Sequence, residues 1–413
     1  MTESRMTDNR RATLPITLPA LATMLAALAM IGPFTIDTYL PSFPHIAADF
    51  SATPAQLQQT LSLYLFTTAL MTLFHGTLSD SFGRRPVILW SLAAYIIASI
   101  GCALASGLPQ LLFWRAVQGL AAGAGIIVGR AVIRDSLEGH EAQRLMSWVT
   151  MIFGIAPAIA PVVGGWLQGL AGWRVIFWFL AVFGACLLAA TALRLPETHP
   201  QSSRQPFRAS VLMRNYLRLG GDLKLVLLCL TIAFNFSGFF LYVVSAPAVI
   251  YNLLGLGETD FAWLFVPGIG GVMIGAYLSG RTARVMPPAR AVSIGYRVMC
   301  AAVLCNLAYC TLWPPALPWT VLPVMLYTIG MSYAMPGATL LALDLFPQLR
   351  GMTSSLQGFA HSLFAGLTAG LVSPLVSGSA LSLALAMAML LACGWGTWLT
   401  YRRAATRPNA EKP

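Results

Sequence analysis

The chain has 413 residues, of which 57% are hydrophobic and only 9% are charged. Soluble globular domains carry roughly 25% charged residues, so this composition excludes a soluble protein and indicates one that crosses a membrane many times. The formal net charge of +11 does not indicate nucleic-acid binding, because the arginines are scattered at the ends of apolar runs and are not clustered on one soluble face.

Long apolar runs predict twelve transmembrane helices, since each crossing needs roughly 20 apolar residues. They are expected at about 16–44, 53–76, 86–106, 109–132, 145–167, 173–194, 223–248, 259–280, 289–312, 318–341, 352–374 and 380–401. The predicted fold class is therefore an all-α polytopic membrane protein. The longest polar stretch separates six helices from six, which predicts an N-terminal six-helix bundle over 1–198, a central cytoplasmic loop over 199–222 and a C-terminal six-helix bundle over 223–413. Such halves imply a pseudo-symmetric pair with substrate bound between them.

The basic residues test this topology. Segments expected on one side of the membrane collect Arg84, Arg85, Arg134, Arg144, Arg281, Arg284, Arg290 and Arg350, and the tail adds Arg402, Arg403, Arg407 and Lys412. The connections expected on the other side hold none, apart from Arg174 at one border. Because cytoplasmic loops are enriched in Lys and Arg, both termini are predicted to be cytoplasmic.

Asp37 is the one acidic residue that lies well inside a predicted helix. Burying a lone carboxylate is costly unless it is paired or protonated, and an apolar environment favours the protonated form, so Asp37 is a candidate proton carrier. Alternatively, the helix ends near Tyr39 and Asp37 is wetted at the membrane interface. Pro41 and Pro44 follow, and they are expected to bend or break the helix.

A charged island from Gly76 to Pro86, Gly-Thr-Leu-Ser-Asp-Ser-Phe-Gly-Arg-Arg-Pro, connects the second and third apolar runs. Asp80 gives the two arginines a nearby anion, and Gly83 can take the positive φ of a sharp reversal. This order of residues resembles the signature between helices 2 and 3 of major facilitator superfamily transporters, which implies a secondary transporter with the fold of that superfamily. The cytoplasmic gating motif that the resemblance implies consists of Gly76, Asp80, Gly83, Arg84 and Arg85.

Two further blocks resemble motifs of this superfamily. Asp37-Thr-Tyr-Leu-Pro-Ser-Phe-Pro44 resembles the helix 1 signature of the Bcr/CflA-type drug exporters, and Arg115-Ala-Val-Gln-Gly119 resembles the helix 4 motif that is linked to proton transfer. The resemblance implies proton coupling by Asp37, Arg115 and Gln118. Asp37 and Arg115 are expected at comparable depth, so a direct or water-bridged pair is geometrically feasible. Alternatively, Arg115 snorkels to the outer headgroups.

The fifth helix combines small residues with prolines. Ala156, Ala160 and Gly164 repeat every four residues, as do Pro157, Pro161 and Gly165. One flank is therefore almost free of side chains, which favours close helix contact. The block resembles the antiporter motif of drug/proton exporters at Ala160, Pro161, Gly164 and Gly165, with alanine at 160 where the family usually has glycine. The alternative is an ordinary packing helix.

Candidates for the substrate cavity come mainly from the seventh helix. They are Asn235, Phe236 and Tyr242, together with Tyr39 of the first helix. An aromatic stripe that faces lipid explains the seventh helix equally well. His75 and His361 are weaker candidates for a proton relay.

The sequence contains no phosphate-binding loop and no metal or nucleophile constellation, which argues against ATP-driven pumping and against a membrane enzyme, and predicts no cofactor and no metal. We therefore expect a monomeric, proton-coupled multidrug exporter of the bacterial inner membrane that works by alternating access. Its expected partners are drug-like small molecules, protons and the lipid bilayer. A dedicated exporter of one endogenous metabolite and a proton-coupled nutrient importer remain alternatives; the fifth helix favours export.

Overall fold

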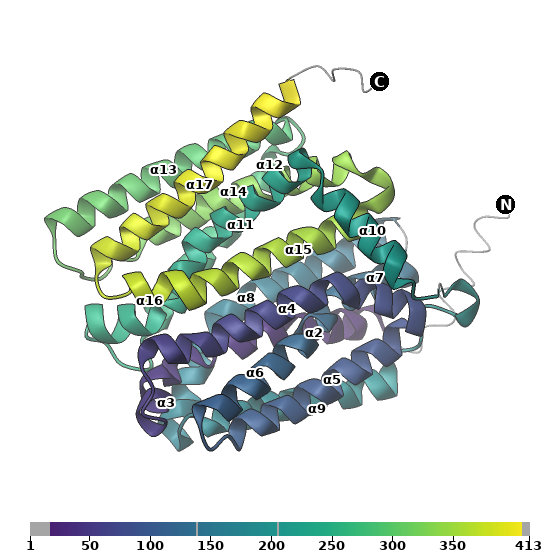
Figure 1. Ribbon diagram of the computed structural model, residues 1–413, viewed down its shortest axis with the longest axis horizontal. Coiled ribbons are helices and arrows are strands. Elements are labelled where there is room, and N and C mark those ends of the chain that lie inside the picture. Colours follow the sequence, from purple (N-terminus) through teal and green to yellow (C-terminus); the bar gives the residue numbers. More distant parts are fainter. Residues whose placement is uncertain (1–16, 138, 205, 407–413) are drawn as a thin grey trace.

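The computed structural model describes residues 17–406 apart from 138 and 205 (Figure 1). The N-terminal residues and the tail residues Arg407 and Lys412, which we expect on the cytoplasmic side, lie outside the described residues. Within the described part every regular element is a helix. Twelve segments are long and apolar enough to cross a membrane, which confirms the predicted number of crossings and the all-α fold class.

The crossings of the first half are built from α2 (Leu18–Asp37), α3 (Phe43–Asp49), α4 (Pro54–Phe82), α5 (Arg84–Ala103), α6 (Leu108–Ala122), α7 (Ala124–Ser136), α8 (Gly139–Ala171) and α9 (Arg174–Arg194). Helix α10 (Ala209–Gly220) lies in the central loop. The second half contains α11 (Leu223–Val244), α12 (Ala262–Thr282), α13 (Pro288–Leu312), α14 (Leu322–Leu345), α15 (Arg350–Leu367), α16 (Ser373–Val376) and α17 (Ala380–Thr406). Two π-helical turns, η3 (Ala248–Leu253) and η5 (Thr368–Val372), interrupt the second half.

The first crossing breaks directly after Asp37. A 3-10 turn over Leu40–Ser42 follows, and α3 then completes the crossing. Pro41 and Pro44 have no backbone N–H, so a continuous helix would lose hydrogen bonds at both positions. The predicted break is confirmed, and Asp37 is the last residue of α2.

The connection between α4 and α5 is shorter than the sequence suggested. Helix α4 continues to Phe82 and α5 begins at Arg84, so Gly83 alone joins them. The expected loop over Gly76–Pro86 is therefore wrong in extent. Asp80 remains in α4 and pairs with Arg84 of α5 across the one-residue junction. The expected positive φ is confirmed, since Gly83 has φ 101°.

The helices form two groups that lie side by side (Figure 1). Helices α2 to α9 pack among themselves, and so do α11 to α17. Contact between the groups runs mainly along α4 with α15 and along α8 with α12. These four helices therefore flank the interface between the two groups.

The two ends of the molecule differ in charge. One end of the molecule is where α4 meets α5 and where α10 lies (Figure 1). The helix bounds place at this end Arg84, Arg85, Arg134, Arg281, Arg350 and Arg403. We call it the arginine-rich end. The opposite end, where α2 ends, is the arginine-poor end, and Arg174 lies there.

Helix α10 connects the two groups at the arginine-rich end. The hydroxyl of Tyr216 donates to the carbonyl of Leu73 in α4 at 2.8 Å, while α10 also contacts α15 of the second group. Burial raises the pKa of Tyr216, and a hydrogen bond with Ser355 of α15 acts in the opposite direction. The central loop is thus a structured element that touches both groups.

Candidate functional site

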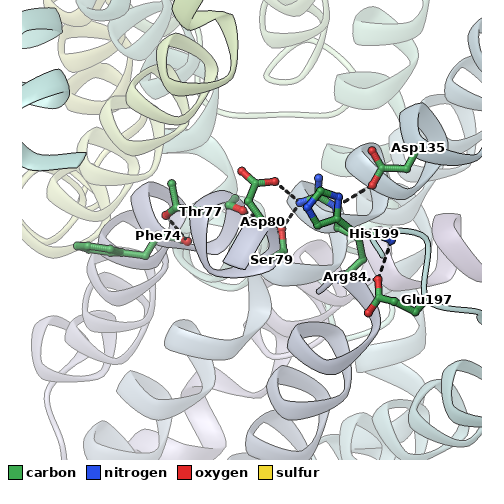
Figure 2. Close-up of polar contacts among 9 residues, drawn as sticks. Phe74, Thr77, Ser79, Asp80, Arg84, Asp135, Glu197 and His199 are labelled. Atoms are coloured by element: carbon green, nitrogen blue, oxygen red, sulfur yellow. Dashed lines mark hydrogen bonds and ion pairs between the residues drawn. The ribbon is translucent and has the colours of Figure 1, made fainter. Parts of the chain in front are cut away.

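Arg84 is the centre of a charged cluster at the arginine-rich end (Figure 2). Its Nη1 donates to Asp80 at 2.5 Å and to the Ser79 hydroxyl at 2.7 Å, and its Nε donates to Asp135 at 2.9 Å. The side chain is buried, with 6% exposure, and the two carboxylates compensate its charge. We call Ser79, Asp80, Arg84, Asp135 and Glu197 the Arg84 cluster.

Glu197 fixes the start of α5 from a distant part of the chain. Its carboxylate accepts from the Arg84 backbone N–H at 3.0 Å (Figure 2), where a negative charge stabilises a helix N-terminus. Gly83 is required here twice, because its φ is positive and because an added Cβ would collide with the side chains of Glu197 and Arg204. Arg85 turns away and donates to the carbonyl of Ala192 near the end of α9, at 2.6 Å.

The gating residues predicted from the sequence therefore lie together, with two additions. The junction of α4 and α5 brings together Asp80, Gly83, Arg84 and Arg85. Gly76 lies within α4, and a Cβ added to it would have no neighbour within 4 Å. Asp135 at the end of α7 and Glu197 after α9 complete the cluster. The sequence signal for both was a carboxylate directly after a crossing that ends on the same side of the membrane.

Arg115 occupies the interior of the first group of helices. The side chain has 0% exposure, and its guanidinium carbon lies 5.0 Å from the ring centre of Tyr39 and 4.6 Å from that of Tyr64. Its Nη1 donates to Gln118 at 2.6 Å and to the carbonyl of Thr35 at 3.3 Å. The carbonyls at the C-terminal end of α2 are a favourable environment for a cation. Snorkelling to the headgroups is excluded for this conformation.

Gln118 extends this arrangement to the third crossing. Its amide nitrogen donates to the Ser99 hydroxyl at 2.8 Å, and Ser99 donates to the carbonyl of Tyr95 at 2.7 Å. Two guanidinium nitrogens of Arg115, Nε and Nη2, have no partner among the described residues. The buried cation is therefore stabilised mainly by aromatic rings and one amide, and not by an anion.

Asp37 is also buried, with 4% exposure, although it ends a helix. The described residues provide neither a hydrogen bond nor an ion pair within 4.0 Å for its carboxylate. Within the described chain, Asp37 and Arg115 do not form the direct pair that the sequence made feasible. The guanidinium is directed instead to Gln118, to the carbonyl of Thr35 and to two tyrosine rings. A carboxyl and a guanidinium are thus buried in one bundle without compensating each other.

The fifth crossing, α8, uses its small residues for close contacts at the arginine-poor end. An added Cβ on Gly164 would collide with the backbone of Thr38, immediately after Asp37, and one on Gly165 would collide with the backbone of Glu258 in the second group. Ala160 and Pro161 are buried on the same flank. The predicted flank without side chains is confirmed, and it contacts both the end of α2 and the other group of helices.

Further hydrogen bonds join the two groups at the arginine-poor end. Gln58 donates to the Ser373 hydroxyl, Gln59 to the carbonyl of Gly370 and Ser62 to the carbonyl of Gly366, each at 2.8 Å. Tyr251 donates to the carbonyl of Pro41 at 2.7 Å. We call these bonds the inter-bundle contacts; each joins uncharged groups.

Sequence reasoning missed the inter-bundle contacts, although a signal was present. Gly366 and Gly370 form a Gly-x-x-x-Gly pattern, which permits close approach of helices in a membrane. An added Cβ on Gly370 would collide with the side chain of Ser62, and one on Gly366 would lie 3.1 Å from the ring of Phe66. Gly370 lies in the π-helical turn η5, a feature that is frequent at functional sites.

The predicted cavity residues are distributed differently. Tyr39 has 0% exposure and supports Arg115, and the Tyr242 hydroxyl accepts from Asn306 of α13. The amide oxygen of Asn235 lies beside Gly394 of α17. In this conformation all three side chains are buried against residues of their own bundle, and their role in a substrate cavity stays a prediction. Phe236 is partly exposed, and its ring centre lies 3.9 Å from that of His361 in α15.

Residues 20–370 match the family model of the Major Facilitator Superfamily, and the chain belongs to this family. It is 32% identical over 354 residues to an uncharacterised transporter of this type, YdgK of Bacillus subtilis, with 85% of this chain and 87% of that protein covered. It is 27% identical to a bicyclomycin resistance protein homolog of Haemophilus influenzae, over 81% of this chain and 84% of that protein. Multidrug resistance protein D of Escherichia coli is 28% identical over 84% of this chain and 86% of its own length.

A solved structure agrees in fold. A bacterial homolog of the human lysosomal transporter Spinster superposes with a TM-score of 0.71, covering 95% of this chain and 98% of its own, at 17% identity. The protein is therefore a multi-pass membrane transporter with the fold of the superfamily.

Proposed function

We propose that the protein is a proton-coupled multidrug exporter of the bacterial inner membrane that works by alternating access. The observation that carries the proposal is the uncompensated burial of Asp37, at 4% exposure, inside a membrane-spanning bundle. Burial without an ion-pair partner makes the charged form of a carboxyl much less favourable than it is in water. Gain or loss of a proton can therefore be linked to a change of conformation that alters this burial. The names of the relatives in Haemophilus influenzae and Escherichia coli support drugs as the substrates.

In this mechanism Asp37 takes up a proton from the arginine-poor side, which lowers the affinity for substrate and releases it there. Loss of the proton to the opposite side restores the state that accepts substrate. Arg115 opposes protonation through its charge, and Gln118 holds the guanidinium at its position. Gly164 lets α8 pack directly against Thr38, at the end of α2. A movement of that end therefore displaces α8, which also contacts the second group.

The orientation follows from the charge asymmetry. The arginine-rich end is cytoplasmic in this proposal, because cytoplasmic loops carry the excess of basic residues. The inter-bundle contacts then close the outer side, and this conformation accepts substrate from the cytoplasm. The contact of Gly165 with Glu258 belongs to the same closed side. The names of the resistance proteins among the relatives support export as the direction of transport.

A susceptibility panel in a pump-deficient bacterial host tests the proposal. Wild type is expected to protect against several unrelated drugs, and Asp37→Asn is expected to protect against none, at equal amounts in the membrane. Asp344→Asn is the matched control, because Asp344 is 66% exposed in its pair with Arg350. Protection against no drug by wild type contradicts multidrug export, whereas protection by Asp37→Asn at the wild-type level contradicts the coupling role.

A further inference from the structure

A pocket opens on the outer face of the first group of helices, away from the interface with the second. It lies between α4, α5 and α6 and has a volume of about 310 Å³. Leu120, Phe82 and Trp90 at its rim are 37%, 46% and 59% exposed, and Phe82 and Trp90 contact each other edge to face with ring centres 5.9 Å apart. In a membrane-spanning helix such exposed apolar side chains face lipid, so the pocket opens to the bilayer.

Two polar side chains line this otherwise apolar pocket, His75 and Ser91. His75 is 1% exposed, and neither of its ring nitrogens has a partner among the described residues. A neutral imidazole always presents one donor and one acceptor, and leaving such groups buried and unpaired costs about 1–3 kcal/mol each. Nδ1 lies against Gly123, at the break between α6 and α7.

Ser91 differs from most hydroxyl residues of these helices. Ser99 and Thr72 each donate to the carbonyl four residues earlier, as is common for such residues within helices. The hydroxyl of Ser91 makes no such bond and has no other partner in the described part of the chain. The pocket therefore combines apolar walls with two unsatisfied hydrogen-bonding groups, which is the usual composition of a small-molecule site.

We propose that this pocket binds an uncharged amphiphile from the bilayer, with an apolar body between α4, α5 and α6 and a hydroxyl that bonds to His75 and Ser91. A hydroxyl both donates and accepts, so it can satisfy a ring nitrogen in either tautomer. Both nitrogens are closed off in this conformation and Nδ1 faces Gly123, so binding includes a rotation of the imidazole toward the pocket. No charged residue lines the pocket, so a charged ligand would be buried without compensation. The proposal does not depend on the direction or the substrate of transport.

The depth of the pocket supports a source in the membrane. His75 precedes Gly83, where α4 ends, by eight residues, which corresponds to about 12 Å along a helix axis. The polar groups therefore lie within the hydrocarbon region, in the half nearer the arginine-rich end. An amphiphile that reaches this depth through the bilayer keeps its apolar body in lipid until it enters the pocket.

Photolabelling of the full chain in phosphatidylcholine nanodiscs tests the proposal. The probes are an octanol and an octane that carry the same diazirine. We expect the octanol probe to label peptides of α4, α5 and α6 and to be displaced by excess 1-octanol. His75→Phe and Ser91→Ala should each lower this labelling about fivefold, the effect of one neutral hydrogen bond, and leave labelling by the octane probe unchanged. Ser293→Ala in α13, whose hydroxyl bonds within its own helix, should have no effect.

Two further arms complete the design. Ala94→Phe fills the pocket and should abolish labelling by both probes, so the test does not depend on the folding of His75→Phe. Displacement by dioleoylglycerol assigns the site to an uncharged lipid, and displacement by octanol alone assigns it to a smaller amphiphile. Equal labelling of these peptides by the two probes, or labelling that is unchanged in His75→Phe and Ser91→Ala, overturns the proposal.

Discussion

The two ends of the molecule are held together by different interactions. At the arginine-rich end, Arg84 bonds to two carboxylates, and all of its partners belong to the first bundle or to the segment that follows it. At the arginine-poor end, the inter-bundle contacts join neutral side chains to carbonyls and hydroxyls of the other bundle. Charge-assisted bonds are worth roughly twice as much as neutral ones.

The difference shows which interactions can break during a transport cycle at a small cost in free energy. When a neutral bond breaks and both groups meet water, little free energy is lost, about 1 kcal/mol for each bond. Removing one partner of a buried ion pair leaves a charge uncompensated, which costs about 3–5 kcal/mol. In the proposed alternating-access cycle, strong pairs therefore suit the interior of a bundle that moves as one body, and weak bonds suit the surface at which the two bundles separate.

The largest effect is expected for Arg84→Met. The variant keeps the apolar stem and loses both ion pairs, so the free energy of unfolding should fall by about 3 kcal/mol, discounted from a fully buried pair because Asp80 is 48% exposed. The thermal midpoint in detergent measures this loss. Arg350→Met, which removes an exposed pair, should change it by less than about 0.5 kcal/mol. Equal losses in the two variants would show that the Arg84 cluster has no special role.

Gly370→Val should act on the other end alone. The introduced valine side chain would collide with Ser62, and such overpacking costs about 1–3 kcal/mol. The collision occurs only while the arginine-poor end is closed, so the cost falls on the closed state alone. We expect the fraction of molecules open at that end to rise about tenfold. Spin-label distances across the two bundles measure this fraction. Gly396→Val, where an added Cβ meets nothing within 4 Å, is the control, and a shift of similar size there would refute the explanation.

Ser62→Ala should produce a smaller shift in the same direction. It removes one neutral hydrogen bond to the carbonyl of Gly366, so the open fraction should rise about fivefold. The same distance measurement detects it, and the thermal midpoint should stay near that of wild type. Ser147→Ala, which removes a bond inside α8, should leave the distances unchanged. A large loss of stability in Ser62→Ala would mean that the inter-bundle contacts also hold the fold together.

Tyr216→Phe should have the smallest effect. It removes the bond from α10 to the carbonyl of Leu73, which is worth about 1 kcal/mol or less at a partly exposed site. Cleavage by trypsin at Arg214 and Arg218 in α10 should become about two- to fivefold faster. Tyr309→Phe, which removes a bond at the opposite end, should cleave at the wild-type rate. Unchanged cleavage in Tyr216→Phe would show that this bond does not hold α10.

The parts that could be predicted from the sequence are local. The number of crossings follows from apolar length, the pair of Asp80 with Arg84 from their closeness in the sequence, and the break after Asp37 from Pro41 and Pro44. The bare flank at Gly164 and Gly165 follows from their period. In each case neighbours within a few turns of helix determine the outcome.

The parts that could not be predicted depend on rotation of helices and on distant partners. Helix α11 is buried on nearly all sides, so no polar face indicated that Asn235 and Tyr242 point to α13 and α17. Asp135 and Glu197 reach Arg84 from 51 and 113 residues away. Arg115 and Asp37 have compatible depths, but the packing of Tyr39 and Tyr64 around the guanidinium decides that they do not pair.

The most direct test of the account is drug-driven proton movement in proteoliposomes that contain the purified protein. With wild type, addition of a transported drug on one side should move protons in the opposite direction, as a pH-sensitive dye inside the vesicles reports. Asp37→Asn should bind the drug and exchange it down its own gradient without moving protons. Proton movement by Asp37→Asn at the wild-type rate would contradict the assignment of coupling to the buried carboxyl of the first crossing.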